Sequence, residues 1–405
     1  MVKKSTLEEV IAFQKNKVES SDLGYERELL RELNHKLDSH ALIVSGIRRC
    51  GKSTLLNQYI SENIQEDYIY LNFDSAKLYT FEINDFQLID ELVAENGVKF
   101  LIFDEIQIIE GWELYIRQKL DEGFKVLITG SNASLLSKEL GTKLTGRHIT
   151  KELFPFSYKE YYSFKSLKSS EASFTAYLKD GGFPAFLKVQ DVDLHSTLVD
   201  DIIHRDIAVR YNIRDVKSLK HLLIFLASNI SNLISATKLK RYIGVKSTAT
   251  LIEYLGYFEQ SYLIQLMPKF SYSHKVQLVN PKKIYFIDNA LQQSITPSFS
   301  ENIGRKLENT VFWELRRKKK SLYYYNENGK ECDFVVLGNN VVEEVIQVCY
   351  LLNSENEKRE IDGLIDAMNY FDLKNGTIIS MNQDDVILHE GKRIEVVPAH
   401  KYFGG

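Results

Sequence analysis

The residues with the clearest chemical meaning form an eight-residue run, Gly46-Ile47-Arg48-Arg49-Cys50-Gly51-Lys52-Ser53. The run matches the pattern G-x-x-x-x-G-K-[ST], follows the apolar stretch 41–44 and opens the helix-compatible stretch 54–60. Glycines let such a loop turn its amide groups inward, and the following helix adds the positive end of its dipole. The lysine of this pattern reaches the β- and γ-phosphates, and the serine hydroxyl ligates Mg²⁺. The run therefore predicts a site for ATP and Mg²⁺, with contacts from Gly46, Arg49, Cys50, Gly51, Lys52, Ser53 and Thr54.

Two acids, Asp104 and Glu105, follow the apolar stretch 99–103. Asp104 is predicted to hold Mg²⁺ with Ser53, directly or through water. Glu105 is predicted to polarise the water that attacks the γ-phosphate. A simple kinase needs no such glutamate, because its substrate supplies the nucleophile, so the pair favours hydrolysis. The alternative is an ordinary solvated turn after a buried strand.

Three further polar residues are candidates for contact with the nucleotide. Ser131 and Asn132 end the apolar stretch 125–130, where one of them would sense the γ-phosphate or the attacking water. Arg147 precedes the last predicted strand of this region. An arginine there suits a finger that reaches the nucleotide of a neighbouring subunit. The alternative for Arg147 is a local ion pair on the surface.

These residues need a scaffold that brings them together. Strands are predicted at 67–74, 99–105, 125–132 and 148–153, with a helix at 84–96. Near-continuous apolar strands that alternate with helices are typical of an α/β fold whose parallel sheet is covered on both faces. Ligands bind at the carboxyl ends of such strands. The phosphate loop, the two acids and the sensor residues all follow strands, so we expect them to converge.

The extra strand between the phosphate loop and the two acids resembles the AAA+ superfamily. More narrowly, Gly-x-Arg-Arg-x-Gly-Lys-Ser, Phe-Asp-Glu-Ile-Gln at 103–107, Thr-Gly-Ser at 129–131 and Gly146-Arg147 before 153–157 are similar to prokaryotic AAA+ ATPases with a C-terminal domain of unknown function. The resemblance implies a homo-oligomeric ring, expected to be a hexamer, because the finger acts across subunits. It implies an ATPase core over residues 1–153 and a helical lid over 154–216. Arg205 in the lid is the expected second sensor, with a lid ion pair as the alternative.

Residues 217–300 are predicted to form a winged-helix domain. Helices are expected at 217–230, 236–243 and 248–255, followed by a strand at 262–266 and a basic, aromatic stretch. The third helix of a winged helix enters the DNA major groove with its N-terminal end. The predicted DNA contacts are Lys238, Lys240, Arg241, Lys246, Thr248, Lys269 and Lys275. The alternative is a module that binds protein.

Residues 301–405 resemble the restriction-endonuclease-like α/β fold. Its metal-binding pattern is a helix Glu, a strand Asp and then Glu/Gln-x-Lys, which Glu308, Asp333 and Gln347 match. Cys349 stands where active nucleases have lysine, and a thiol cannot supply the positive charge that stabilises phosphate. The expectation is therefore a DNA-shaped domain with a degenerate site. Cleavage with a weakly held metal, or a purely structural role for the two acids, are the alternatives.

Composition limits the class of protein. The 405 residues carry a formal charge of −4 and three cysteines, with no pair of cysteines at a metal-binding spacing. No apolar run is long enough to span a membrane, and the N-terminus lacks the apolar segment of a signal peptide. We therefore expect a cytoplasmic, Mg²⁺-dependent AAA+ ATPase that remodels or translocates along DNA, with branched or junction DNA favoured. The alternatives are a nucleotide-driven regulatory or defence switch that binds proteins, and an ATP-regulated nuclease.

Overall fold

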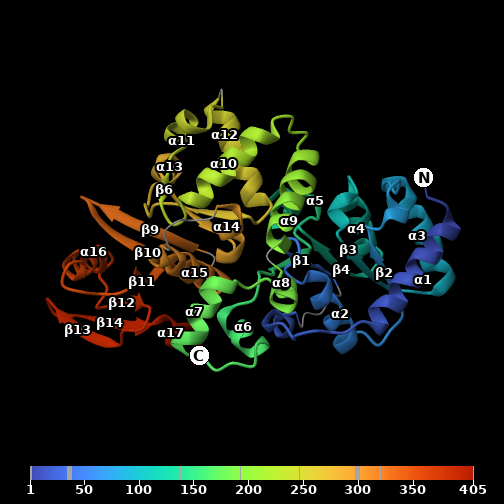
Figure 1. Cartoon of the computed structure of the whole chain (residues 1–405). Coiled ribbons are helices and arrows are strands. Elements are labelled where there is room, and N and C mark those ends of the chain that lie inside the picture. Colours follow the sequence, from blue (N-terminus) through green and yellow to red (C-terminus); the bar gives the residue numbers. More distant parts are fainter. Residues whose placement is uncertain are drawn as a thin grey trace. The chain divides into compact units, whose positions relative to one another are not determined.

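The computed structural model describes residues 2–33, 39–136, 138–191, 193–245, 247–296, 302–318 and 321–404. The chain divides into two compact units, Met1–Phe154 and Pro155–Gly405, which run from blue to green and from green to red in Figure 1. Over the described ranges, no helix combines the length and the apolar composition that crossing a membrane requires.

The first unit is built on a five-stranded sheet. Its elements are α1 (Lys4–Ser20), η1 (Glu28–Glu32), β1 (Ala41–Ser45), α2 (Lys52–Asn63), β2 (Tyr68–Asn72), η2 (Ala76–Leu78), η3 (Ile83–Asp85), α3 (Phe86–Asn96), β3 (Phe100–Asp104), η4 (Ile106–Ile108), α4 (Trp112–Asp121), β4 (Lys125–Gly130), η5 (Ala133–Leu136), α5 (Lys138–Lys143) and β5 (His148–Glu152). All five strands are parallel, in the order β2-β3-β4-β1-β5. The predicted parallel sheet is confirmed, and β4 lies between β1 and β3.

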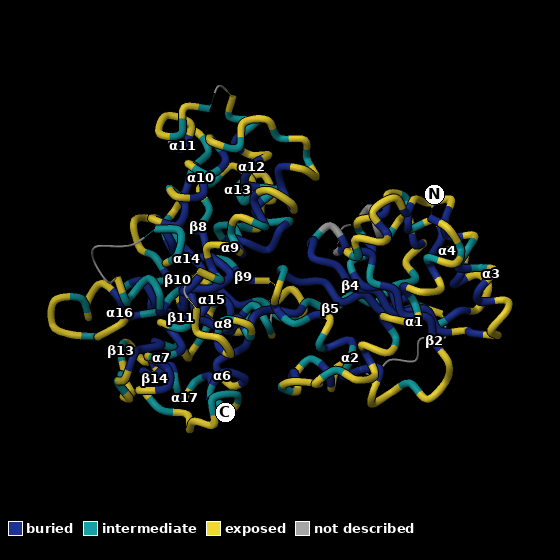
Figure 2. Tube along the Cα trace, turned by 45° about the vertical axis from the view of Figure 1, so that its right-hand side comes forward, coloured by how far each residue is buried: buried dark blue, intermediate teal, exposed yellow. Residues whose placement is uncertain are grey.

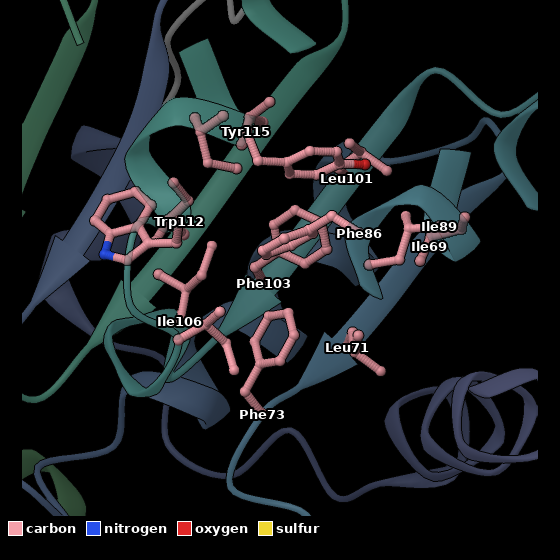
Figure 3. Close-up of a cluster of buried hydrophobic side chains, with 14 of the residues drawn as sticks. Ile69, Leu71, Phe73, Phe86, Ile89, Leu101, Phe103, Ile106, Trp112 and Tyr115 are labelled. Atoms are coloured by element: carbon pink, nitrogen blue, oxygen red, sulfur yellow. The ribbon is translucent and has the colours of Figure 1, made fainter. Parts of the chain in front are cut away.

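One face of this sheet carries an aromatic core. Alternate strand residues such as Leu71 and Phe103 pack against Phe86 of α3 and against Trp112 and Tyr115 of α4, as Figure 3 shows. The rings of Phe86 and Tyr115 are stacked, with centroids 4.1 Å apart. Side chains on a strand alternate between the two faces, so the neighbouring residues face the other side. The sheet is therefore buried on both faces and holds the ends of its strands in fixed positions.

The second unit begins with helices. They are α6 (Tyr158–Phe164), α7 (Glu171–Asp180), α8 (Pro184–Val189), α9 (Asp193–Asp201), the π-helix η6 (Ile202–Val209) and α10 (Val216–Ser228). This region is helical, as the sequence predicts for the lid. A break at Gly181-Gly182 separates α7 from α8. Gly182 has no room for a side chain, since a Cβ there would lie 2.4 Å from the Phe156 carbonyl oxygen.

A small sheet with helices follows. Its elements are β6 (Leu233–Ile234), α11 (Ala236–Ile243), α12 (Thr248–Gln260), β7 (Ile264–Met267), α13 (His274–Val279), β8 (Lys282–Phe286) and α14 (Asn289–Ile295). The strands are antiparallel in the order β6-β8-β7. The helices α10, α11 and α12 and the strand β7 lie close to the positions predicted for them, whereas β6 and α13 are not predicted. The outer sides of α11 to α13 are largely exposed (Figure 2).

The chain ends in a six-stranded mixed sheet. The elements are α15 (Ile303–Lys318), β9 (Ser321–Glu327), β10 (Lys330–Gly338), β11 (Val341–Cys349), α16 (Glu357–Tyr370), β12 (Asn375–Ser380), β13 (Asp385–His389), β14 (Lys392–Pro398) and α17 (Ala399–Gly404). The strand order is β13-β14-β12-β11-β10-β9. From α15 to α16 the chain forms a helix, three strands and a second helix.

The two sheets of the second unit are joined through β8 and α15. The Asn309 side chain accepts a hydrogen bond from the Phe286 amide (2.8 Å) and donates one to the Phe286 carbonyl (2.9 Å). The rings of Tyr285 and Phe312 stack with centroids 4.0 Å apart. These contacts are buried, so the small sheet and the six-stranded sheet share one interior.

Candidate functional site

The loop between β1 and α2 has a backbone that few residues tolerate. Arg49 and Gly51 both have positive φ, at 64° and 102°. Gly46 approaches the neighbouring backbone so closely that a Cβ would lie 2.0 Å from the Leu153 carbonyl oxygen. The hydrogen-bond ladder of α2 begins with the Leu55 amide and the Gly51 carbonyl (2.9 Å). The backbone amides before Leu55 therefore have no acceptor within the helix. They form a helix N-terminus of the kind that binds anions.

The Lys52 side chain lies within this loop and is buried. Its Nζ donates to the carbonyls of Gly46 (3.1 Å) and Ile47 (3.2 Å) and lies 3.4 Å from Glu105 Oε1. Burial acts to lower the pKa of Lys52, but the negative charge of Glu105 outweighs it and the pKa is raised. The ammonium group is therefore charged, and two neutral carbonyl oxygens and one carboxylate hold it in place.

Asp104 lies at the end of β3 and is fully buried. Its Oδ2 accepts hydrogen bonds from Ser53 Oγ (2.7 Å), Asn72 Nδ2 (2.8 Å) and the Tyr70 hydroxyl (3.0 Å). The Thr129 hydroxyl donates to Oδ1. Burial, with the charge of the adjacent Glu105, raises the pKa of Asp104. The carboxylate is thus fixed in orientation by groups from α2, β2 and β4.

Glu105 follows directly and has a left-handed backbone, with φ at 55°. This conformation turns its side chain back towards the loop, where Oε1 faces Lys52 and Oε2 accepts from Gln107 Nε2 (2.5 Å). Burial acts to raise the pKa of Glu105, but the positive charge of Lys52 prevails and lowers it. Glu105 is therefore an ionised carboxylate beside the phosphate loop, as a base for water requires.

Gln107 connects the base to the sensor position. Its Nε2 also donates to Ser131 Oγ (3.2 Å). A Cβ at Gly130 would lie 2.3 Å from Gln107 Oε1, so only glycine leaves room for this amide. The predicted residue Ser131 is therefore close to Glu105. Asn132 lies beside it, and its carbonyl accepts from Ser45 Oγ (2.9 Å), which ties β4 to the start of the loop.

The site fits a magnesium nucleotide. Two oxygens bound side by side to an octahedral Mg²⁺ lie about 3 Å apart, and Ser53 Oγ and Asp104 Oδ2 are separated by 2.7 Å. Ser53 is exposed, so its hydroxyl is accessible to a metal–phosphate complex. A cavity of about 560 Å³ lies beside Ser53, Tyr70 and Asn72, bounded by α1. Thr54 lies in the first turn of α2, at the same helix end.

Arg147 lies at the amino ends of the parallel strands, opposite the carboxyl ends that the phosphate loop follows. Its carbonyl accepts from the Ala41 amide at the start of β1, whereas the phosphate loop follows the end of β1. Its guanidinium pairs with Asp121 Oδ1 (2.7 Å). Arg147 is thus remote from the phosphate loop of its own chain, and its role as a finger stays a prediction. Arg205 is exposed on η6 in the second unit, and its sensor role stays a prediction too.

The sequence reasoning did not identify four residues of this site. They are Tyr70, Asn72, Gln107 and Thr129. Asn72 and Thr129 stand near the ends of β2 and β4, and a search for polar residues at strand ends would have found them. Tyr70 lies within an apolar strand, where nothing in the pattern separates it from a core residue.

The predicted DNA contacts differ in their surroundings. Lys240 and Arg241 are exposed at the end of α11, Thr248 begins α12 after the cap Ser247, and Lys275 is exposed on α13. Lys246 and the side chain of Lys238 lie outside the described residues. Lys269 is 16% exposed and pairs with Glu327 (2.8 Å), because the segment before α13 hydrogen-bonds to Tyr324 of β9. Lys269 is therefore not part of the open basic face that the sequence predicts.

The three residues of the degenerate nuclease pattern do come together in the second unit. Glu308, Asp333 and Gln347 border a cavity of about 760 Å³. The Asp333 amide donates to Gln347 Oε1 (3.1 Å). Cys349 ends β11 and is buried, which raises the pKa of its thiol to about 11. Within the described part of the chain, no group of three or more His, Cys, Asp or Glu side chains is arranged to hold a metal ion.

Comparison with known proteins agrees with the phosphate-loop site. The family model described as an AAA domain matches residues 38–162, and the one described as a domain of unknown function (DUF8612) matches residues 171–302. The uncharacterized protein MJ1544 of Methanocaldococcus jannaschii is 33% identical over 98% of this chain and 96% of its own length. An uncharacterized protein of Haemophilus influenzae is 32% identical over 80% of this chain and 85% of its own.

Solved structures give only distant likenesses. The STAND protein PH0952 of Pyrococcus horikoshii is 14% identical, with 74% of this chain and 47% of its own covered and a TM-score of 0.27. AMPPCP-bound DnaA of Aquifex aeolicus is 14% identical, with 62% and 88% covered and a TM-score of 0.26. TM-scores this low carry no weight in the assignment. The identity to MJ1544 along nearly all of both chains shows that this chain belongs to the same family as MJ1544, and the match over residues 38–162 shows that it contains an AAA domain.

Proposed function

We propose that the chain is a Mg²⁺-dependent ATPase that uses ATP hydrolysis to remodel, or to move along, DNA. The observation that carries the ATPase part is the pair formed by Ser53 Oγ and Asp104 Oδ2, 2.7 Å apart, next to the ammonium of Lys52 and the carboxylate of Glu105. Together they supply a place for the metal, a cation for the phosphates and a base for water.

The contacts of Lys52 suggest how ATP binding prepares hydrolysis. Lys52 Nζ now lies between two carbonyls and Glu105. A γ-phosphate carries more charge than any of these groups, so it draws the ammonium towards itself. Glu105 then keeps its hydrogen bond from Gln107 and is released from Lys52, so its Oε1 is available to accept a proton from water. Bound Mg²⁺ would neutralise charge on the phosphates.

The DNA part of the proposal rests on the second unit. The order α10, β6, α11, α12, β7, α13 and β8 resembles that of a winged helix with one additional helix, α13, between its last two strands. In a winged helix, the second helix of the helix-turn-helix enters the major groove. That helix would be α12, and the exposed Lys240 and Arg241 at the end of α11 would lie near the phosphates. Branched DNA is the substrate we favour, and a ring in which Arg147 reaches the neighbouring nucleotide is the assembly we propose.

The test is an ATPase assay of the purified chain with duplex, single-stranded and four-way DNA. The double variant Lys240→Glu/Arg241→Glu is expected to lose most of the stimulation by DNA and to keep the basal rate. Each lost phosphate contact lowers the slope of log affinity against log salt by about 0.9 on duplex DNA. Lys168→Glu/Lys179→Glu changes the net charge equally on exposed positions of the helical region and serves as the control. Unchanged stimulation and slope in the first variant would contradict the DNA-binding role.

A regulatory switch that binds protein is the second candidate. The same region exposes large apolar side chains, with Tyr242 70%, Tyr272 81% and Leu278 74% exposed. Exposed apolar groups of this size are typical of protein contacts rather than of phosphate contacts. An ATPase rate that no DNA form changes would favour this candidate over the first.

A further inference from the structure

Three acids that line the cavity of the second unit, Glu308, Glu331 and Asp333, are bound to a cation that the nuclease-like pattern does not include. This cation is Lys283 of β8, a strand of the small sheet. Its Nζ lies 2.6 Å from Asp333 Oδ1, 2.8 Å from Glu331 Oε1 and 3.2 Å from Glu308 Oε1. The lysine is almost completely buried. One ammonium therefore contacts three carboxylates from α15 and β10.

The environment keeps Lys283 charged. Burial acts to lower the pKa of Lys283, but Asp333 and Glu308 outweigh it and raise the pKa well above its usual value. The Tyr285 hydroxyl donates a further hydrogen bond to Glu308 Oε1 (2.8 Å). Because the hydrogen bonds to Glu308 come from β8, the cluster also links the small sheet to the six-stranded sheet.

The oxygen atoms that a metal would need are already bonded to other groups. Asp333 Oδ1 accepts from Lys283, and its Oδ2 accepts from the Val348 amide (2.9 Å). Gln347 is held at both ends of its side chain, by the Asp333 amide and by Glu360 Oε2 (2.5 Å). A hard cation such as Mn²⁺ or Mg²⁺ prefers several free carboxylate and carbonyl oxygens. In this cluster, the ammonium of Lys283 occupies the position between the carboxylates that such a cation would need.

We propose that Lys283 is the resident cation of the cluster formed by Glu308, Glu331 and Asp333, and that it excludes divalent metal ions from their carboxylates. The carboxylates then form ion pairs that link the small sheet to the six-stranded sheet. They do not support metal-dependent cleavage of phosphodiesters. This inference concerns the second unit alone and does not depend on ATP hydrolysis in the first.

The proposal makes a positive prediction for a variant. The single charge of one ammonium does not balance the negative charge that three carboxylates can carry. Lys283→Met removes the ammonium that contacts all three carboxylates and keeps an unbranched side chain of similar length. The carboxylates would then need another cation, and a divalent ion supplies more charge than the lysine did. We expect Lys283→Met to bind Mn²⁺ at this site.

The experiment uses the full chain without nucleotide, so that the phosphate loop contributes equally in every variant. Mn²⁺ uptake is followed by electron paramagnetic resonance, and melting is followed with Mn²⁺ and with EDTA. Wild type is expected to take up no Mn²⁺ beyond the amount taken up by Asp333→Asn, which keeps the phosphate loop, and its Tm should respond to Mn²⁺ no more than that of Asp333→Asn. Lys283→Met is expected to lose roughly 5–10 °C in EDTA, because buried carboxylates lose their partner, and to regain most of it with Mn²⁺. Lys282→Met, one residue earlier on β8 and more exposed, is the matched control and should behave as wild type.

Two results would overturn the proposal. The first is Mn²⁺ uptake, or Mn²⁺-dependent nicking of DNA, by wild type that disappears in Asp333→Asn. The second is a folded Lys283→Met that takes up no Mn²⁺. The double variant Lys283→Met/Asp333→Asn is expected to lose the new uptake, because it lacks one of the carboxylates that would bind Mn²⁺. If Lys283→Met does not fold, the Mn²⁺ titrations of wild type and Asp333→Asn still test the proposal, because they measure directly whether metal is excluded from the cluster.

Discussion

Both units place a buried lysine beside carboxylates, and the two lysines are held very differently. Lys52 donates to two carbonyl oxygens at 3.1 and 3.2 Å and lies 3.4 Å from one carboxylate. Lys283 contacts three carboxylates at 2.6, 2.8 and 3.2 Å. An ammonium is attracted more strongly to an ionised carboxylate than to a neutral carbonyl oxygen, because both partners of the first pair carry a charge. The second lysine is therefore held by much stronger bonds than the first.

The difference indicates two roles. Lys52 can exchange its present contacts for a phosphate, whereas Lys283 occupies the position that a metal ion would take. The contacts of Lys52 are weak enough for an incoming phosphate to displace them, and they lie at a helix N-terminus that favours anions. The contacts of Lys283 already compensate its charge, and the surrounding acids repel phosphate. A lysine among acids thus indicates a site only when its present partners are poorer than the ligand would be.

Among the variants that test this comparison, Lys52→Ala is expected to have the largest effect on ATP hydrolysis. The phosphates lose their fixed countercharge, and we expect ATP hydrolysis to fall by about 10³-fold or more, with nucleotide binding also lost. Binding of a fluorescent ATP analogue and steady-state hydrolysis measure both effects. Lys282→Met removes a lysine from the second unit and should leave both unchanged. Hydrolysis by Lys52→Ala near the wild-type rate would mean that the phosphate loop is not the catalytic site.

Glu105→Gln tests the group that now faces Lys52. The amide keeps the hydrogen-bonding shape but cannot take a proton from water, so we expect hydrolysis to fall by about 10²–10⁴-fold. ATP binding should persist or tighten, since Lys52 no longer has a carboxylate to leave. Equilibrium binding and single-turnover hydrolysis separate the two steps. If the variant hydrolyses ATP at the wild-type rate, the base is another residue.

The first site was largely predictable because its residues lie in one short motif and at strand ends. The backbone of a phosphate loop dictates glycine at 46 and 51, and the alternation of apolar strands with helices dictates the edge where Asp104 and Ser131 meet. In the sequence, Gln107 stands out only as the last residue of the Phe-Asp-Glu-Ile-Gln motif, which assigns it no contact. Its role depends on the space that Gly130 leaves, and such a close approach between two loops has no signature in the local sequence.

The second unit shows what the sequence could not reveal. The pattern around Glu308, Asp333 and Gln347 correctly predicted that they meet, because each lies on an element of one small sheet domain. The pattern placed the missing charge at position 349, on the adjacent strand. The structure supplies a positive charge from Lys283, on a strand of another sheet and 50 residues before Asp333. Contacts between distant elements depend on packing, which the order of residues does not show.

Gln107→Ala would give a smaller effect in the first site. Glu105 loses one charge-assisted hydrogen bond and the contact through Gln107 to Ser131, so the carboxylate is less well positioned. We expect kcat to fall roughly tenfold with KM for ATP nearly unchanged, because Gln107 holds the base and makes no phosphate contact. A steady-state titration with ATP measures both constants. A change in KM alone would show that Gln107 contributes to nucleotide binding instead.

The smallest expected effect concerns the pH dependence of the second unit. Burial raises the pKa of Glu308 from 4.5 to about 7, despite the opposing charge of Lys283. A carboxyl group whose pKa is higher in the folded state binds its proton more tightly there, so protonation stabilises the fold. That contribution is fully present below pH 4.5 and is lost as pH rises towards 7 and above. We expect it to amount to roughly 1–3 kcal/mol.

Glu308→Gln cannot titrate, so its Tm should vary less than that of wild type between pH 4.5 and pH 7. Glu355→Gln changes an exposed carboxylate on the same cavity and should keep the wild-type profile. Parallel profiles for Glu308→Gln and wild type would mean that Lys283 compensates Glu308 completely. The cluster would then be a balanced ion pair. A flatter profile would show that one ammonium is too little charge for three carboxylates, which is the condition under which removing Lys283 admits a metal ion.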